Sequence, residues 1–235
     1  MPGNSSDHSK ADVLRQHEFF SGLPCGLIQK LSFRSRRVTY KAGDTIFSKG
    51  DEGHGLLAVL SGTVRVSTSS KDGKEVILNL IVENEVFGEI ALLDGGPRTA
   101  DASAQTDCIL MFLDRRDFTP LLIQYPEIAL RILKVVCKRL RRTTKQVESL
   151  GLRGVQARLA STLLDLADIQ GFTYSTQPKI RITQKELGNM LGLSRESTNR
   201  HLREWENAGL LALEKGVCII LNPKRLANLY RETAE

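Results

Sequence analysis

The chain has 235 residues, enough to bury one large core or two ordinary ones, and its 41% hydrophobic and 26% charged residues are typical of a globular protein. It contains no run of about 18 apolar residues, and its first residues are too polar for a signal peptide, so nothing indicates export or a membrane and we expect a cytoplasmic protein. The net charge of +6 favours an anionic partner without identifying it.

The N-terminal half begins with two predicted short helices, at about 11–20 and 25–33, and continues with short β-rich runs separated by turn residues. The predicted strands are 45–47, 56–60, 63–68, 76–81 and 109–113. Several strands at this spacing favour an antiparallel sandwich or roll. A further helix is expected over 115–124, before the pair Tyr125-Pro126.

The segment FGEIALLDGGPRTA, residues 87–100, carries most of the chemistry of this half. Gly88 allows a ligand to approach the backbone closely, and the turn that follows offers free amides to an anion. Arg98 supplies a guanidinium for the same anion through charge-assisted hydrogen bonds. Because a carboxylate beside a phosphate must serve another group, we assign Glu89 to a ribose 2′-hydroxyl. The segment therefore predicts a nucleotide site.

After Pro126, five apolar residues and one threonine follow one another at alternating spacings of three and four. The positions are Leu133, Val136, Leu140, Thr143, Val147 and Leu150. This is an a/d seam on a long helix whose other faces are mostly Lys and Arg. The narrow stripe favours a parallel homodimer seam, and the alternative is a helix packed on its own β-domain.

Gly151 and Gly154 indicate a hinge into a smaller C-terminal domain. Its predicted elements are helices at 153–169, 184–191 and 195–208, and strands at 179–182 and 216–221, the last closing a winged hairpin. Thr183 and Ser194 can cap the two later helices, and Gly192 supplies the tight turn between them. This pattern is a helix-turn-helix.

On a helical wheel of the second of these helices, Thr198, Leu202 and Trp205 form a packing face, and the opposite face is free to reach DNA. Arginine can bond guanine through two acceptors, and glutamate can accept from cytosine, so the exposed residue types suit base edges. We expect Lys185, Ser194 and Ser197 to contact DNA phosphates and so to position the protein on the DNA. The candidate DNA-binding residues are Lys185, Ser194, Arg195, Glu196, Ser197, Asn199 and Arg200.

Both motifs have a recognisable counterpart. FGEIALLDGGPRTA resembles the phosphate-binding cassette of cyclic-nucleotide-binding domains without a gap, and with SRESTNR it resembles the cyclic AMP receptor protein (catabolite activator protein) family of bacterial regulators. The resemblance runs from about Val38 to Ile220. It implies an α+β chain with a β-roll cyclic-nucleotide-binding domain at 11–125, a dimerisation helix at 126–151 and a winged helix-turn-helix domain at 152–235.

The resemblance also implies roles for individual residues. Gly88, Glu89, Arg98 and Thr99 would hold the sugar and phosphate, together with the backbone of Ile90 and Ala91. Arg139 would brace Glu89, and Thr143 and Thr144 match the pair that touches the purine from both subunits. A threonine hydroxyl can serve adenine or guanine, so cyclic AMP is the expected effector and cyclic GMP a second candidate.

In the recognition helix, the resemblance places Arg195, Glu196 and Arg200 at the base-reading positions and implies a palindrome of TGTGA-like half-sites. Asn199 departs from the family's glycine and adds a polar side chain that we expect to point toward DNA. The family also implies a contact with RNA polymerase, for which the loop 170–178 and the basic run 34–37 are candidates. We expect a homodimer whose partners are DNA and the nucleotide.

Two rival interpretations remain. The first is a regulator of the same fold that senses redox state, haem or another metabolite, which would need a ligand set. Cys25, Cys108, Cys137 and Cys218 lack metal-site spacing and the histidines form no cluster, so we expect buried, reduced thiols, no metal and no cofactor. The second rival is an enzyme, and no catalytic motif is present. We therefore expect a non-catalytic regulator.

Overall fold

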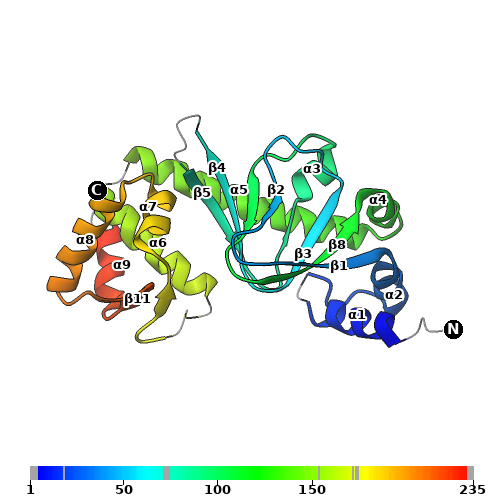
Figure 1. The fold of residues 1–235 in the computed structure, drawn as a ribbon, viewed down its shortest axis with the longest axis horizontal. Coiled ribbons are helices and arrows are strands. Elements are labelled where there is room, and N and C mark those ends of the chain that lie inside the picture. Colours follow the sequence, from blue (N-terminus) through cyan, green and yellow to red (C-terminus); the bar gives the residue numbers. More distant parts are fainter. Residues whose placement is uncertain are drawn as a thin grey trace. The chain divides into compact units, whose positions relative to one another are not determined.

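A computed structural model describes residues 5–17, 19–70, 75–152, 154–170, 172 and 175–231. The chain divides into two compact units (Figure 1). The first comprises the chain up to Thr68 together with Leu78–Cys137, and the second comprises Ser69–Ile77 and the chain from Lys138 onward. In the described residues, no helix has the length and apolar character that crossing a membrane requires.

Eight strands form two four-stranded antiparallel sheets. One sheet has the order β1-β8-β3-β6 and the other β2-β7-β4-β5. The strands are β1 (Ser35–Tyr40), β2 (Thr45–Phe47), β3 (Gly55–Ser61), β4 (Val64–Ser69), β5 (Glu75–Ile81), β6 (Val86–Phe87), β7 (Asp101–Ala104) and β8 (Cys108–Asp114). The antiparallel roll expected from the sequence is therefore confirmed.

The first sheet is covered on both faces. Leu57, Val59 and Leu110 belong to a core shared with the second sheet. Leu56 and Met111, which alternate with them, belong to a second core with helices α1 (Ser5–Gln16), α2 (Cys25–Arg34) and α4 (Arg115–Gln124). Because side chains alternate between the faces of a strand, β3 reads as an almost continuous apolar run.

Helix α5 (Pro126–Leu152) has two kinds of apolar residue. Ile128 and Ile132 are buried against the β-roll, and Val136 packs on the same core. Leu133, Leu140 and Val147, spaced by seven residues, are 54%, 65% and 63% exposed. Of the predicted seam, Val136 thus packs on its own domain, whereas Leu133, Leu140 and Val147 stay open in the single chain. The side chain of Leu150 lies outside the description.

The second unit contains a helix-turn-helix followed by a small antiparallel sheet of order β10-β11-β9. Its elements are α6 (Val155–Ile169), β9 (Lys179–Arg181), α7 (Gln184–Leu191), α8 (Arg195–Asn207), β10 (Leu211–Glu214), β11 (Val217–Ile220) and α9 (Pro223–Arg231). Glu75, the first residue of β5, also belongs to this unit, where Asn189 Nδ2 donates to Glu75 Oε2 at 3.1 Å. The predicted α+β architecture of roll, long helix and winged helix-turn-helix is confirmed.

Several local predictions need correction. The first helix ends at Gln16 instead of extending to 20, and α6 begins at Val155; Arg153, where it was expected to start, lies outside the described residues. Strands β1, β6, β7 and β10 and helix α9 were not predicted. Cys108 and Cys218 are buried free thiols as expected, but Cys25 and Cys137 are exposed. Cys25 opens helix α2, and Cys137 lies on a solvent-facing side of α5.

Candidate nucleotide cradle and DNA-reading helix

The predicted cassette is compact in the structure. Gly88 follows β6 with a φ of 78° and is the residue before α3 (Glu89–Asp94), which ends at Gly95 with a φ of 76°. A Cβ on Gly88 would collide with Nη1 of Arg98, so this glycine is required by both its backbone conformation and its neighbour. The sequence places Gly88 and Arg98 ten residues apart, and the fold brings them into contact.

Arg98 is the central cation of the site and only 6% exposed. It donates from Nη1 to the carbonyl of Gly88 at 2.9 Å and from Nη2 to the carbonyl of Gly55 at 3.0 Å. Its Nε is buried and has no hydrogen-bond partner. A buried donor without a partner costs free energy, so an anion that accepts from Nε would satisfy it. The site therefore fits an anionic group such as a phosphate.

Burial lowers the pKa of Arg98 below its ordinary value, and the carboxylates of Glu89 and Asp51 act in the opposite direction. An arginine in a protein stays protonated, so the guanidinium keeps its charge inside the fold. Glu89 is 1% exposed and begins α3, close enough to influence Arg98. The cradle thus combines a buried cation with a buried carboxylate, which are the groups that a phosphate and a hydroxyl would need.

The remaining cassette residues differ in exposure. Thr99 and Ile90 are exposed, whereas Ala91 is buried. A Cβ on Gly53 would collide with the Cβ of Ala91, so the loop before β3 packs tightly on α3. Ala91 can therefore offer only its backbone to a ligand.

Sequence reasoning missed Phe47 and Gly55. The guanidinium carbon of Arg98 lies 4.3 Å from the centre of the Phe47 ring, and Gly55 supplies the second carbonyl acceptor. The Phe47 ring is also 5.8 Å from that of Phe87. An arginine over an aromatic face gains a cation–π attraction. No local signal marks Phe47, because β2 reaches Arg98 only through long-range strand pairing.

The other three predicted nucleotide residues lie on α5, in the second unit. Arg139 is half-buried, and Thr143 and Thr144 are exposed. The hydroxyl of Thr144 donates to the carbonyl of Leu140 at 3.0 Å, one turn earlier in the helix. Gly88, Glu89, Ile90, Ala91, Arg98 and Thr99 lie together in the first unit, whereas Arg139, Thr143 and Thr144 belong to the second.

The helix-turn-helix is built by local capping. Thr183 and Glu186 form a reciprocal capping box at the start of α7, and Gly192 ends that helix with a φ of 67°. Ser194 caps α8 by accepting from Ser197 N at 3.1 Å. A Cβ on Gly188 would lie 3.0 Å from Thr198 Oγ1, so this glycine allows the two helices to pack closely. The caps and the turn predicted from the sequence are all present.

Helix α8 has one buried and one open face. Thr198, Leu202 and Trp205 are buried, which confirms the predicted packing face. The exposed residues of the candidate DNA surface are Lys185, Ser194, Arg195, Glu196 and Arg200, and Ser197 is half-buried. Asn199 differs from the expectation: it is half-buried, and its Oδ1 is enclosed without a hydrogen-bond partner. Its side-chain oxygen is therefore turned into the protein and not toward DNA.

A β-roll with a buried arginine cradle, followed by a winged helix-turn-helix with an open basic face, defines a class of protein: a DNA-binding transcription regulator with a cyclic-nucleotide-binding domain. Comparison with known families agrees. Residues 37–125 match the cyclic nucleotide-binding domain family, and residues 157–229 match the Crp-like helix-turn-helix domain family.

Known proteins are similar over nearly the whole chain. A CRP-like cAMP-activated global transcriptional regulator of Mycobacterium tuberculosis is 30% identical over 222 residues, 94% of this chain and 99% of the relative. The cyclic AMP receptor protein of Thermus thermophilus is 35% identical over 186 residues, 79% and 83% of the two chains. The c-di-GMP responsive regulator CLP of Xanthomonas campestris superposes with a TM-score of 0.74 at 25% identity, covering 84% of this chain and 99% of its own.

This chain therefore belongs to the CRP family of transcription regulators. Its relatives regulate transcription and are not enzymes. The effector is a cyclic nucleotide as a class, and the helix-turn-helix implies binding to DNA.

Proposed function

We propose that the chain is a homodimeric regulator that binds cyclic AMP, with cyclic GMP as a second ligand, and then a palindrome of TGTGA-like half-sites. The observation that carries the proposal is the buried Arg98, whose Nε lacks a partner in a cradle shared with Glu89. The functional regions of this proposal are the nucleotide domain at 11–125, the dimerisation helix at 126–151 and the DNA-binding domain at 152–235.

In the proposed complex, Arg98 binds the cyclic phosphate, and the carboxylate of Glu89 accepts a hydrogen bond from the ribose 2′-hydroxyl. Gly88, Thr99 and the backbone of Ile90 and Ala91 complete the cradle. Names of relatives support cyclic AMP as the first ligand, since two of them are described as cAMP-activated or as a cyclic AMP receptor. The exposed hydroxyl of Thr99, directly after Arg98, is why cyclic GMP is kept as the second ligand.

The long helix would supply the base-binding residues and the dimer seam. Three exposed aliphatic side chains at heptad spacing support a partner helix there. In such a dimer, Thr143 and Thr144 touch the purine from both subunits, and Arg139 braces Glu89. The polar threonines in the seam then have a partner in the ligand, which offsets the cost of burying their hydroxyls.

DNA recognition would fall to the open face of α8. Arg195, Glu196 and Arg200 read base edges, and Lys185, Ser194 and Ser197 hold phosphates. The amide of Asn199 takes part through its nitrogen, since its oxygen is enclosed. A dimer places two such helices about 34 Å apart, one turn of DNA. A contact with RNA polymerase, at the basic run 34–37 or the loop 170–178, belongs to the proposal; residues 171, 173 and 174 of that loop are outside the described residues.

Calorimetric titration with cyclic AMP and cyclic GMP tests the proposal. We expect saturable binding of cyclic AMP to the wild type and a loss of at least about a hundredfold in Arg98→Leu, because a charge-assisted contact is removed. Arg37→Leu is the matched control, since Arg37 is an exposed arginine of the same unit. Circular dichroism checks that both variants fold. Absence of binding by the wild type, or equal affinity in Arg98→Leu, would overturn the proposal.

A further inference from the structure

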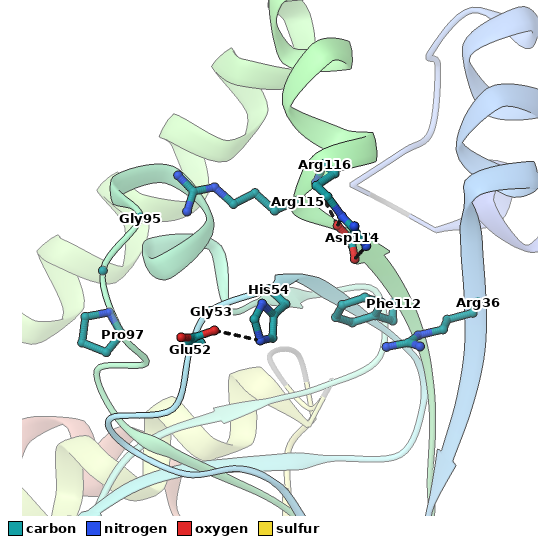
Figure 2. Close-up of a pocket in the computed structure, with 11 residues that line it drawn as sticks. Arg36, Glu52, Gly53, His54, Gly95, Pro97, Phe112, Asp114, Arg115 and Arg116 are labelled. Atoms are coloured by element: carbon teal, nitrogen blue, oxygen red, sulfur yellow. Dashed lines mark hydrogen bonds and ion pairs between the residues drawn. The ribbon is translucent and has the colours of Figure 1, made fainter.

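The first unit has a second concave site, separate from the cradle around Arg98. Figure 2 shows this pocket of about 810 Å³, formed by β1, the loop before β3, the turn after α3, the end of β8 and the start of α4. The volume lies in the range of small-molecule sites. Three arginines from two places in the sequence line it: Arg36 on β1, and the consecutive Arg115 and Arg116 at the start of α4. We call this site the arginine pocket.

The carboxylates of the arginine pocket are already engaged. Asp114 caps α4 through Arg116 N at 2.9 Å and pairs with Arg116 Nε at 3.3 Å. Glu52 lies 3.4 Å from the ring of His54. Across the described residues, no carboxylate is within ion-pair distance of Arg36 or Arg115. Two guanidinium groups of the pocket therefore lack an anion.

Both unpaired arginines are held in place by neighbours that leave their donors usable. The guanidinium of Arg36 lies 4.4 Å from the centre of the Phe112 ring, a cation–π contact. Arg115 is half-buried and reaches the turn after α3, where a Cβ on Gly95 would lie 2.9 Å from its Nη2. Figure 2 shows the two side chains on different sides of His54. A guanidinium is planar and matches carboxylate or phosphate oxygens with paired donors.

The arginine pocket shares its backbone with the cradle. Glu52 and Pro97 form an isolated antiparallel bridge, and next to it Arg98 N donates to the carbonyl of Asp51 at 2.8 Å. The carbonyl of Arg98 in turn accepts from Gly50 N at 2.9 Å. The paired segments 50–52 and 97–98 thus do two things. Glu52 and Pro97 line the arginine pocket, and the same pairing holds the backbone of Arg98. A ligand that shifts this pair would move the guanidinium of Arg98.

We propose that the arginine pocket binds a small metabolite carrying two anionic groups, phosphate or carboxylate, one for Arg36 and one for Arg115. Occupation of the pocket alters the affinity of the Arg98 cradle for its ligand, and this second statement rests on the proposed function. The coupling is reciprocal, so the cyclic nucleotide changes the affinity of the pocket by the same factor.

Binding is tested with the full chain and three probes: inorganic pyrophosphate, citrate and inorganic phosphate. We expect saturable binding of pyrophosphate or citrate with a Kd near or below about 1 mM, and weaker binding of phosphate, which can engage one arginine only. Pyrophosphate alone identifies a phosphorylated ligand, and citrate alone a carboxylate ligand. Either result supports the site.

Variants locate the binding. Arg36→Gln and Arg115→Gln should each weaken it by at least about tenfold, the loss of one charged contact. Arg37→Gln is the matched control, because Arg37 is the next residue of β1 and alternation places it on the opposite face. Thermal melting of each variant verifies folding. No saturable binding of any probe, or an equal loss in Arg37→Gln, would overturn the proposal.

Two further measurements distinguish this site from the cradle and a small anion from a protein partner. Arg98→Leu should retain pyrophosphate or citrate binding even where it loses cyclic nucleotide, so failure of one site is distinguishable from failure of the other. A polyglutamate peptide is titrated in parallel. Binding of the peptide without binding of either small anion would contradict the proposal and indicate a protein partner.

Discussion

Gly88 and Arg98 share one small space at the cradle. The glycine has a φ of 78°, and its missing side chain leaves room for the Arg98 guanidinium, which returns a hydrogen bond to the Gly88 carbonyl. A side chain at Gly88 would be unfavourable for two reasons: the positive φ strains any L-residue, and the Cβ would collide with Arg98. The position of the Arg98 guanidinium therefore depends on the absence of a Cβ ten residues away.

We expect Gly88→Ala to abolish measurable nucleotide binding or weaken it by more than about tenfold, because the guanidinium is displaced. It should also destabilise the fold by about 1–2 kcal/mol through left-handed strain. Gly43→Ala is the control: its φ is 93° and its Cβ would meet nothing within 4 Å. That variant should share the strain and keep its affinity in calorimetry. Equal nucleotide affinity in Gly88→Ala and the wild type would contradict the geometry.

His17 is a second residue whose role depends on burial. It is 2% exposed, and its Nδ1 accepts from Phe19 N at 3.2 Å, which requires an unprotonated nitrogen. Burial lowers the pKa of His17 from 6.5 to about 4, and contacts with the backbone of Glu85 and Val59 offset only part of this. The folded chain therefore holds a neutral ring where the unfolded chain would take up a proton.

The pH dependence of stability follows from that difference. As the pH falls from 6.5 to about 4, the unfolded chain protonates His17 and the folded chain does not, so stability is lost with acid. The full loss is about 3 kcal/mol at 1.36 kcal/mol for each pKa unit. Urea unfolding followed by circular dichroism should show a shallower acid slope in His17→Gln than in the wild type. Identical slopes would disprove the assignment.

At the scale of elements, α7 depends on its first residue. Thr183 Oγ1 accepts from Glu186 N at 3.2 Å, and Glu186 Oε2 accepts from Thr183 N at 2.8 Å, so two free amides of the helix end are satisfied. Such a cap contributes about 1 kcal/mol. Helix α7 in turn packs on α8 through Gly188, so its stability supports the recognition helix.

We expect Thr183→Ala to lower the stability of the second unit by about 1 kcal/mol, and Thr183→Ser, which keeps the hydroxyl, to lower it by less. The only tryptophan, Trp205, is buried in α8, so its fluorescence reports unfolding of this unit in urea. An unchanged midpoint in Thr183→Ala would show that the capping box is dispensable.

Elements with strong local signals were predicted to within one or two residues, and others were missed. The capped helices α4 and α7 have the predicted bounds, and the apolar run of β3 was recognised. Strand β7, Asp101–Ala104, consists of small residues and becomes a strand because β2 and β4 pair with its two edges. Helix α9 is amphipathic and packs on α6. Such long-range partners are absent from the local pattern.

The whole molecule leaves an apolar stripe of α5 open in the single chain. Leu133, Leu140 and Val147 lie seven residues apart, and each is more than half exposed. Burying a leucine side chain contributes about 1.5–3 kcal/mol of stability. Each of these three positions would therefore stabilise a dimer if it packed against a second copy of the helix. In the proposed dimer, the partner helix would bury this exposed stripe of α5.

We expect Leu140→Asn to weaken the dimer by at least about tenfold in sedimentation velocity, since both copies lose the contact. Ile123→Asn is the control, because Ile123 is an exposed aliphatic residue on α4, away from the seam. The seam variant should also lose affinity for operator DNA. A dimer constant that is unchanged in Leu140→Asn, or equally reduced in Ile123→Asn, would exclude this seam.

The sequence by itself determined the β-rich N-terminal half, the long helix, the capped helix-turn-helix and the apolar stripe of α5, because each of these is written in residues close together along the chain. Only the tertiary structure decided that Phe47 and Gly55 hold Arg98, that the oxygen of Asn199 is enclosed, and that Arg36 and Arg115 face one pocket. Those contacts join segments that are distant in sequence, and strand pairing and packing, which no local pattern encodes, bring them together.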